Sequence, residues 1–172
     1  MIEMKVKTIA MDTDNKNPVM ILTDIEEKRY LPIWIGASEA AAIIDEMEGT
    51  SRPRPMTHDL MKIVFQHFHG KIRRVIVNEL QDQTYFARMV VEHDGKETEI
   101  DARPSDSVAM ALRFKAPIFV TEGVIQAAAI ADKSKLADEH RKFKDFLEHI
   151  SAEMFAAAPA KAEGRVEPPK ED

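Results

Sequence analysis

Residues 71–101, KIRRVIVNELQDQTYFARMVVEHDGKETEID, decide the fold class. Residues 71–80 and 85–93 are rich in β-branched and aromatic side chains, so they predict two strands joined by a turn at residues 81–84. The pair Asp94-Gly95 is typical of a hairpin turn, and it leads into a further strand that ends near Asp101. The segment therefore predicts successive hairpins, the building units of an antiparallel sheet.

Strands and helices are predicted on both sides of this segment. Pro32 places the strand that contains it at a sheet edge or at a strand start, because proline cannot donate to a central ladder. Ser38 and Thr57 are the expected N-caps of the first two helices. The predicted strands are residues 2–12, 19–23, 30–35 and 117–120, and the predicted helices are residues 39–48, 59–69, 104–115 and 124–131. This pattern indicates an α+β fold.

Two further patterns concern the helices. In the helix at residues 59–69, the apolar residues Leu60, Met61, Val64, Phe65 and Phe68 are expected to face inward.

Each half of the chain also shows about three strands followed by a Ser-acid pair that opens a helix. These segments are Ile35-Gly36-Ala37-Ser38-Glu39 and Ala102-Arg103-Pro104-Ser105-Asp106. They indicate either a repeated unit or two helix caps that look alike because capping favours the same residues.

Composition narrows the function classes. The 172 residues include no cysteine, which excludes disulfides, thiol nucleophiles and cysteine-ligated metals. Oxygen and imidazole ligands remain, and these favour magnesium, calcium or manganese. The net charge of −6 means that a polyanion needs a local basic patch. The N-terminus does not resemble a secretory signal and the longest apolar run is too short to cross a bilayer, so we expect a cytoplasmic protein.

The C-terminal part differs in character from the rest. Residues 134–155 predict a strongly amphipathic helix that serves in packing or in oligomer formation. Residues 156–172 are dominated by Ala, Pro, Lys and Glu and predict a disordered tail. Trp34, between two isoleucines, is expected in the core or at an interface.

The first polar segment that suits chemistry is Arg52-Pro53-Arg54-Pro55-Met56-Thr57-His58-Asp59. Its prolines stiffen a loop that presents two arginines, and it ends where a helix begins with unpaired N–H groups and a positive dipole end. Such a place suits a phosphate. The structural alternative makes Thr57 a cap, Asp59 a dipole partner and His58 a surface side chain.

The second segment is Asp101-Ala102-Arg103-Pro104-Ser105-Asp106-Ser107, at a strand-to-helix turn. Its two carboxylates could share one divalent cation that polarises a phosphoryl oxygen and activates water. The alternative is that Ser105 caps the helix and that Arg103 pairs with Asp59 or Glu39. We predict that the two segments meet, because separate clusters could not share one phosphate.

Four ordered motifs resemble the bifunctional nuclease family. They are Leu31-Pro32-Ile33-Trp34-Ile35-Gly36, the arginine-proline segment from Arg52 to Leu60, the run from Ile100 to Leu112, and Ala116-Pro117-Ile118-Phe119-Val120. The resemblance covers about residues 1–131. It implies an α+β domain with a mixed, largely antiparallel sheet and helices packed against it, a homo-oligomer, and action on RNA and DNA. Residues 132–155 would then be a helix packed on this domain or on a partner subunit.

The resulting prediction is a nuclease that hydrolyses phosphodiester bonds in RNA, DNA or both with the help of Mg²⁺ or Mn²⁺. Asp101 and Asp106 are the metal-ligand candidates, with Glu39 or Asp59 as a third carboxylate. His58 is the general base or acid. The expected phosphate-binding residues are Arg52, Arg54 and Arg103. The alternative is a non-catalytic module in which the same cluster binds a small anionic ligand or a protein partner.

Overall fold

Seven strands form one mixed sheet in the computed structural model, which describes residues 1–12 and 16–133. Their spatial order is β3-β2-β1-β7-β4-β5-β6, and every neighbouring pair is antiparallel except β4 and β7. This confirms the α+β prediction with a largely antiparallel sheet. The strands are β1 (Ile2–Met11), β2 (Pro18–Asp24), β3 (Tyr30–Trp34), β4 (Lys71–Gln81), β5 (Thr84–His93), β6 (Lys96–Ala102) and β7 (Ile118–Val120).

Four helices accompany the sheet: α1 (Ala37–Glu48), α2 (Thr57–His67), α3 (Pro104–Phe114) and α4 (Glu122–Lys133). None of the helices within the described ranges is long and apolar enough to span a membrane. The predicted amphipathic helix at residues 134–155 and the predicted tail at residues 156–172 lie outside the described residues.

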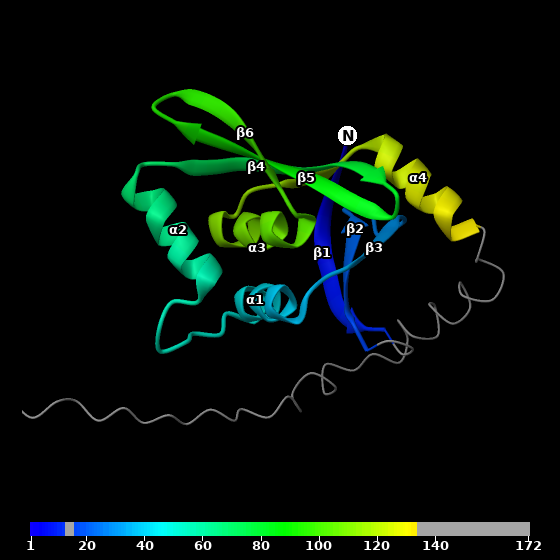
Figure 1. Cartoon of the computed structure of the whole chain (residues 1–172), viewed down its shortest axis with the longest axis horizontal. Helices are drawn as coiled ribbons and strands as arrows, with labels where there is room; N and C mark the ends of the chain where they lie inside the picture. The colour runs from blue at the N-terminus through cyan, green and yellow to red at the C-terminus, as the bar shows by residue number, and fades with distance from the viewer. Residues whose placement is uncertain (13–15, 134–172) are drawn as a thin grey trace, which may run out of the picture. The chain divides into compact units, whose positions relative to one another are not determined.

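The repeat indicated by the sequence is a real feature of the architecture. Strands β1, β2 and β3 form an antiparallel meander that is followed by α1, and β4, β5 and β6 form a second meander that is followed by α3. The short β7 lies between the two meanders, antiparallel to β1 and parallel to β4. Figure 1 shows α1 and α3 side by side, so the repeat brings the starts of two equivalent helices to one region.

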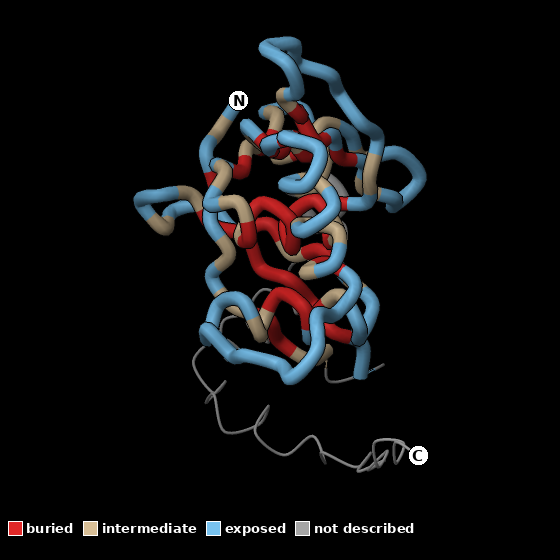
Figure 2. Tube along the Cα trace, turned by 90° about the vertical axis from the view of Figure 1, so that its left-hand side faces the viewer, coloured by how far each residue is buried: buried red, intermediate tan, exposed pale blue. Residues whose placement is uncertain are grey.

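The core is centred on α3 and the strands that it covers. Almost all of α3 is buried, including Val108 and Met110, which are fully inaccessible. In Figure 2 the buried segments run through the middle of the chain and the exposed segments are turns and outer helices. The β2 strand reads as a continuous buried run, PVMILT, because both of its faces are covered. Burying this apolar surface is the main stabilising contribution to the fold.

Element boundaries agree with the sequence to within two residues, with small corrections at the caps. Met56 and Gly36, rather than Thr57 and Ser38, hold the N-cap positions of α2 and α1. The β3 strand lies at the sheet edge, as Pro32 predicted. Trp34 is not in the core: the residue is more than half exposed, and its indole N–H donates to Asp12 at 2.9 Å.

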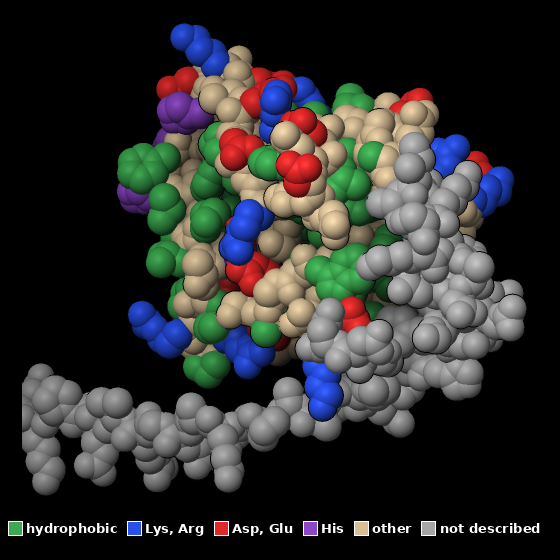
Figure 3. Space-filling view, turned by 45° about the vertical axis from the view of Figure 1, so that its right-hand side comes forward, with side chains coloured by type: hydrophobic (Ala, Val, Ile, Leu, Met, Phe, Trp, Pro, Cys, Tyr) green, Lys and Arg blue, Asp and Glu red, His purple; other side chains and the backbone are tan. Residues whose placement is uncertain are grey.

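The orientation predicted for α2 is wrong in part. Met61 and Phe65 are half-buried, but Leu60, Val64 and Phe68 are exposed. The helix is apolar on both sides, and among the described residues only one side has a neighbour. Figure 3 shows hydrophobic side chains gathered along the edge of the molecule where α2 lies.

Candidate active site

The first turns of three helices carry the polar residues of the site. The third residue of each helix is an acid: Glu39 in α1, Asp59 in α2 and Asp106 in α3. Acids are favourable at helix starts because unpaired N–H groups and the helix dipole give the start a partial positive charge. Capping preference therefore explains why acids occur at these positions, and the tertiary fold determines what each acid contacts.

His58 and Asp106 join the two polar segments of the sequence. The His58 Nε2 atom lies 3.0 Å from Asp106 Oδ1, and the His58 side chain is only 9% exposed. His58 is thus a nearly buried residue, not the surface side chain of the alternative interpretation. This contact between α2 and α3 confirms that the two segments meet.

Arg103 bridges two of the helix-start acids. Its Nε donates to Asp106 Oδ2 and its Nη2 donates to Glu39 Oε1, each at 2.7 Å. The hydrogen bonds to Asp106 and then to Glu39 raise the pKa of the Arg103 guanidinium. Glu39 and Asp106 occupy equivalent places in the two repeats, so a single arginine crosslinks the repeats at the site. Of the two partners that the sequence suggested for Arg103, Glu39 is correct and Asp59 is not.

Asp59 is instead held by Arg113, which the sequence analysis missed as a partner. Arg113 Nε donates to Asp59 Oδ1 at 2.8 Å, and Nη1 donates to the carbonyls of Ala42 and Ala109. Partial burial raises the pKa of the Asp59 carboxyl, but the Met56 N–H and the Arg113 guanidinium outweigh this effect and the net pKa is lowered. Arg113 follows Asp106 by seven residues, so two helical turns place both on the same side of α3, a signal that could have identified it.

Three predicted site residues lie apart from this cluster or have other partners. Asp101 is exposed on β6, where it pairs with Arg88 in the β5–β6 ladder, and its carboxylate forms no ion pair with a described residue. Arg52 is bound at both Nε and Nη2 by the carboxylate of Asp45. Arg54 is exposed, and no ion pair joins it to an acid in residues 1–12 and 16–133. Arg54 therefore has no acidic partner among the described residues, whereas Arg52 is paired with Asp45 and lies outside the cluster around Arg103.

The carboxylates of the site already have a cationic partner. Glu39 and Asp106 both accept hydrogen bonds from Arg103, which provides the positive charge that a divalent ion would otherwise provide. Within the part of the chain that is described, no group of three or more His, Asp or Glu side chains is arranged to hold a metal ion. An ion bound between Glu39 and Asp106 would have to compete with Arg103.

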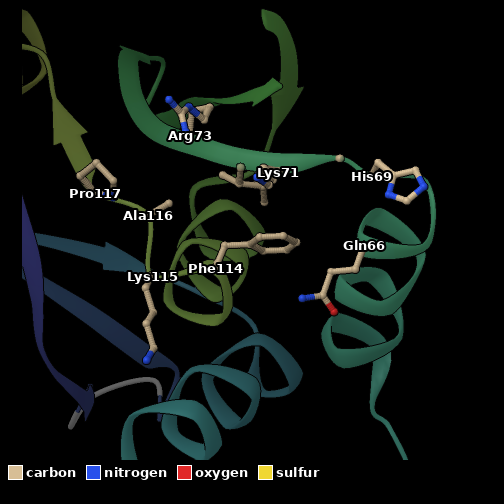
Figure 4. A pocket seen from close by; sticks show the side chains of 10 residues that line it. Gln66, His69, Lys71, Arg73, Phe114, Lys115, Ala116 and Pro117 are labelled. Carbon is tan, nitrogen blue, oxygen red and sulfur yellow. The ribbon is translucent and has the colours of Figure 1, made fainter. Parts of the chain in front are cut away.

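A second feature lies at the opposite ends of α2 and α3. There, an open groove of about 690 Å³ is bordered by the start of β4, with the Phe114 side chain among its walls (Figure 4). It is lined by the basic residues Lys71, Arg73 and Lys115 together with His69, and by no acidic residue. Arg73 forms an ion pair with Glu92, whereas neither lysine forms one with a described residue. The groove is thus a local basic region on an acidic protein.

Comparisons with known proteins agree with these observations. The chain matches the family model described as the bifunctional nuclease domain over residues 20–133, a range that contains the whole cluster. It is 39% identical over 164 residues to a protein of Mycobacterium tuberculosis strain H37Rv described as uncharacterised, covering 90% of this chain and 98% of that protein. It is 26% identical over 97 residues to bifunctional nuclease 1 of Oryza sativa subsp. indica, covering 55% of this chain and 29% of the rice protein.

Proposed function

We propose that this chain, which belongs to the bifunctional nuclease domain family, hydrolyses phosphodiester bonds in RNA, DNA or both. The observation that carries the proposal is the contact of 3.0 Å between His58 Nε2 and Asp106 Oδ1. This contact pairs a side chain that can transfer a proton near neutral pH with a carboxylate that fixes its orientation. It lies where three helix starts meet, each of which already holds an acid, and beside the arginine that bridges two of these acids.

The chemistry assigned to His58 is general-base catalysis. In the tautomer proposed here, Nε2–H donates a hydrogen bond to the Asp106 carboxylate, so the lone pair that would act as the base lies on Nδ1. Nδ1 accepts a proton from water while the water oxygen attacks phosphorus, and Asp106 stabilises the imidazolium that forms. The bond from phosphorus to the leaving oxygen breaks, that oxygen takes a proton from solvent, and His58 returns its own proton to solvent.

Arginine side chains supply the charge that stabilises phosphate. The bonds of Arg103 to the two acids use Nε and Nη2, so Nη1 remains for a phosphate oxygen, and the side chain is 65% exposed. Arg54 is the second phosphate-binding candidate because its charge has no acidic partner among the described residues. Holding Arg103 between Glu39 and Asp106 orients it before the substrate arrives, which lowers the cost of binding.

The basic groove suggests that the protein binds several phosphates of a nucleic-acid strand, in addition to the phosphate that is cleaved. It lies at the ends of the same two helices, α2 and α3, whose starts carry His58 and Asp106. Lys71 and Lys115 would then bind phosphates distant from the bond that is cleaved. Such contacts are sequence-independent and weaken with salt, as expected for an enzyme that accepts both RNA and DNA.

The divalent cation predicted from the sequence remains a prediction. The Asp101 side chain takes no part in the hydrogen bonds that Arg103 forms. Glu39 and Asp106 both accept hydrogen bonds from Arg103. The donor set in this arrangement does not fit a cation without displacement of that arginine. The proposed mechanism therefore assigns no step to a metal, and the assay below includes metal as a variable.

The decisive experiment is digestion of single- and double-stranded RNA and DNA by purified His58→Ala and Asp106→Asn variants, each with EDTA, Mg²⁺ or Mn²⁺. Loss of the general base is expected to lower the rate about 100-fold or more. His93→Ala is the matched control, since His93 is an exposed histidine on the β5–β6 hairpin. Equal activity of His58→Ala and His93→Ala would exclude His58 as the general base, and would assign the observed cleavage to another site or to a contaminating nuclease. Absence of cleavage by wild type would favour the binding of a small anionic ligand or a protein partner.

A further inference from the structure

The basic groove at the ends of α2 and α3 has an aromatic ring among its cations. Lys71 and Arg73 are exposed on β4, and no acidic residue lines the groove. Figure 4 shows the half-buried Phe114 ring in the groove, with Lys71 of β4 on one side of it and Gln66 of α2 on the other. The cations suit a phosphate group, whereas the ring suits a flat, uncharged part of a ligand.

Helix ends account for only part of the positive charge. His69 and Lys115 follow the last turns of α2 and α3, where cations are favourable because helix carbonyls are unpaired there. Lys71 and Arg73 belong to β4, and strands carry no comparable dipole. The ion pair of Arg73 with Glu92 is formed through Nε, which leaves the two Nη groups as donors. Lys71 and Arg73 are therefore the cations that a phosphate would contact.

The ring is held in place by its neighbours. Phe65 of α2 lies edge-on to Phe114 of α3, with ring centres 6.1 Å apart and ring planes at 70°. Gly70, just before β4, packs so closely on the other side of this contact that a Cβ atom on it would lie 3.3 Å from Phe65 Cδ1. A ring fixed in this way loses little conformational freedom when a base stacks on it, so stacking is favourable.

An amide lies next to the ring. Gln66 is exposed on α2, and its side chain carries both N–H donors and a carbonyl acceptor. Glutamine uses such a pair of groups to bind the edge of a nucleobase, adenine above all. Stacking accepts every base, so Phe114 would supply affinity and Gln66 would supply a preference among bases.

We propose that this groove is a subsite for one nucleotide. Lys71 and Arg73 bind its phosphate. The Phe114 ring stacks on its base, and Gln66 forms hydrogen bonds with the base edge. The volume of about 690 Å³ is within the range of sites that hold small ligands. The ligand is defined by a phosphate joined to a planar base, either as a free mononucleotide or as one residue of a strand.

The subsite is distinct from the candidate active site. Gln66 follows His58 by eight residues of α2, a separation of about 12 Å along a helix. One phosphate cannot contact both places, so a strand cleaved beside His58 would place another of its nucleotides in the groove. Lys115 points away from the Phe114 ring in Figure 4, and it remains for a neighbouring phosphate. The strand form of the proposal rests on the proposed function, whereas the binding of a free nucleotide does not.

The first test is calorimetric titration of the full chain, in EDTA, with adenosine monophosphate, ribose phosphate and inorganic phosphate. Stacking on an aromatic side chain should make the nucleotide bind about 10-fold or more tightly than ribose phosphate. Lys71→Gln should weaken both ligands by a similar factor, and Lys96→Gln, at an exposed lysine of β6, should weaken neither. Equal affinity for nucleotide and ribose phosphate would overturn the proposal and leave a simple anion site. Lack of saturable nucleotide binding at millimolar concentration would overturn it as well.

Matched variants assign the binding to the groove. Phe114→Leu keeps an apolar side chain against Phe65 and should abolish the preference for nucleotide over ribose phosphate. Phe86→Leu, at an exposed phenylalanine of β5, should keep that preference. Gln66→Ala changes an exposed helix position, so the fold should persist while nucleotide binding weakens several-fold. Gln81→Ala, at the exposed end of β4, is its control. Groove variants that bind as tightly as their controls would refute the assignment.

A short single-stranded RNA distinguishes the two sources of the nucleotide. Its binding is measured with Gln66→Ala in a His58→Ala background, in which cleavage of the RNA is suppressed. Weaker binding of both RNA and free nucleotide would place the groove on the substrate path. Weaker binding of the free nucleotide alone would identify a separate nucleotide site, and unchanged binding of both would contradict the subsite. Failure of the nuclease proposal has a different signature, which is a wild type that binds nucleotides and cleaves nothing.

Discussion

Replacement of Arg113 by methionine tests whether the buried arginine holds the three helices together. The Arg113 side chain is 2% exposed and its guanidinium binds Asp59 of α2, the carbonyl of Ala42 in α1 and the carbonyl of Ala109 in its own helix. Methionine keeps much of the apolar stem and removes the charge and the donors. The change therefore isolates the polar contribution of one side chain to the packing of α1 and α2 on α3.

The expected loss of unfolding free energy depends on how exposed the former partners of Arg113 are to water. Removing one partner of a fully buried ion pair costs about 3–5 kcal/mol, because the other charge stays buried. The Asp59 carboxylate is 35% exposed, so water partly replaces the arginine and the cost lies at the lower end. The lost hydrogen bond to Ala42 adds to it. We expect a loss of about 3 kcal/mol, which lowers Tm by about 10 °C for a domain of this size.

The assay is thermal and urea unfolding at pH 7, followed by circular dichroism. Arg73→Met is the matched control, because Arg73 forms an exposed ion pair with Glu92, and such pairs contribute about 0–1 kcal/mol. A stability of Arg113→Met equal to that of Arg73→Met would refute the role assigned to Arg113.

The same contact has a pH dependence with a defined sign. The pKa of Asp59 is lower in the folded chain than its ordinary value of about 3.8. Its contribution to stability is therefore complete above that value, and it is lost as the pH falls through the lowered pKa of the folded state. The difference in unfolding free energy between wild type and Asp59→Asn should be constant near neutral pH and should shrink below pH 4. A difference that grows on acidification would contradict the ion pair.

Three other changes probe the site and the groove. Arg103→Ala leaves Asp106 and Glu39 without their shared cation, so Mn²⁺ should raise its Tm more than that of wild type; equal shifts would show that the arginine does not compete with a metal. Lys115 is the C-cap of α3 and has a φ of 54°, so Lys115→Gly should raise the free energy of unfolding in urea by about 1 kcal/mol. The same change should weaken single-stranded RNA binding at low salt, because it removes a cation from the groove. Unchanged RNA binding would exclude this lysine from the substrate path. Gly36→Ala places a methyl group against the Glu39 carboxylate and should reduce activity with little loss of Tm; full activity would show that the bond from Arg103 to Glu39 is dispensable.

The sequence predicted those features that depend on neighbouring residues in the chain. Asp94-Gly95 forms the predicted hairpin because its residues adopt the positive φ values that the turn needs. Pro32 lies in an edge strand for the same kind of local reason. The acids at the helix starts were visible as well, because capping preference is a property of a few consecutive residues.

The sequence did not predict the features that depend on distant partners. Asp59, Glu39 and Asp106 are similar acids at similar helix positions, and only the fold shows that Arg113 binds the first while Arg103 binds the other two. The predicted orientation of α2 was wrong in part for a related reason. Periodicity identifies apolar positions, but it cannot tell which of two apolar sides has a neighbour in the protomer.

The strand in the middle of the sheet, β7, is the last of the seven described strands that the ribosome would produce. The three residues of β7 connect the β1 edge of one meander to the β4 edge of the other. Until residue 120 has left the exit tunnel, β1 and β4 are open edges that can pair with other chains. Every residue of the candidate active site precedes β7 in the chain, so those residues are synthesised before the two meanders can be joined. Completion of the sheet during translation, rather than formation of either meander, would then be the step at which Arg103 first reaches Glu39.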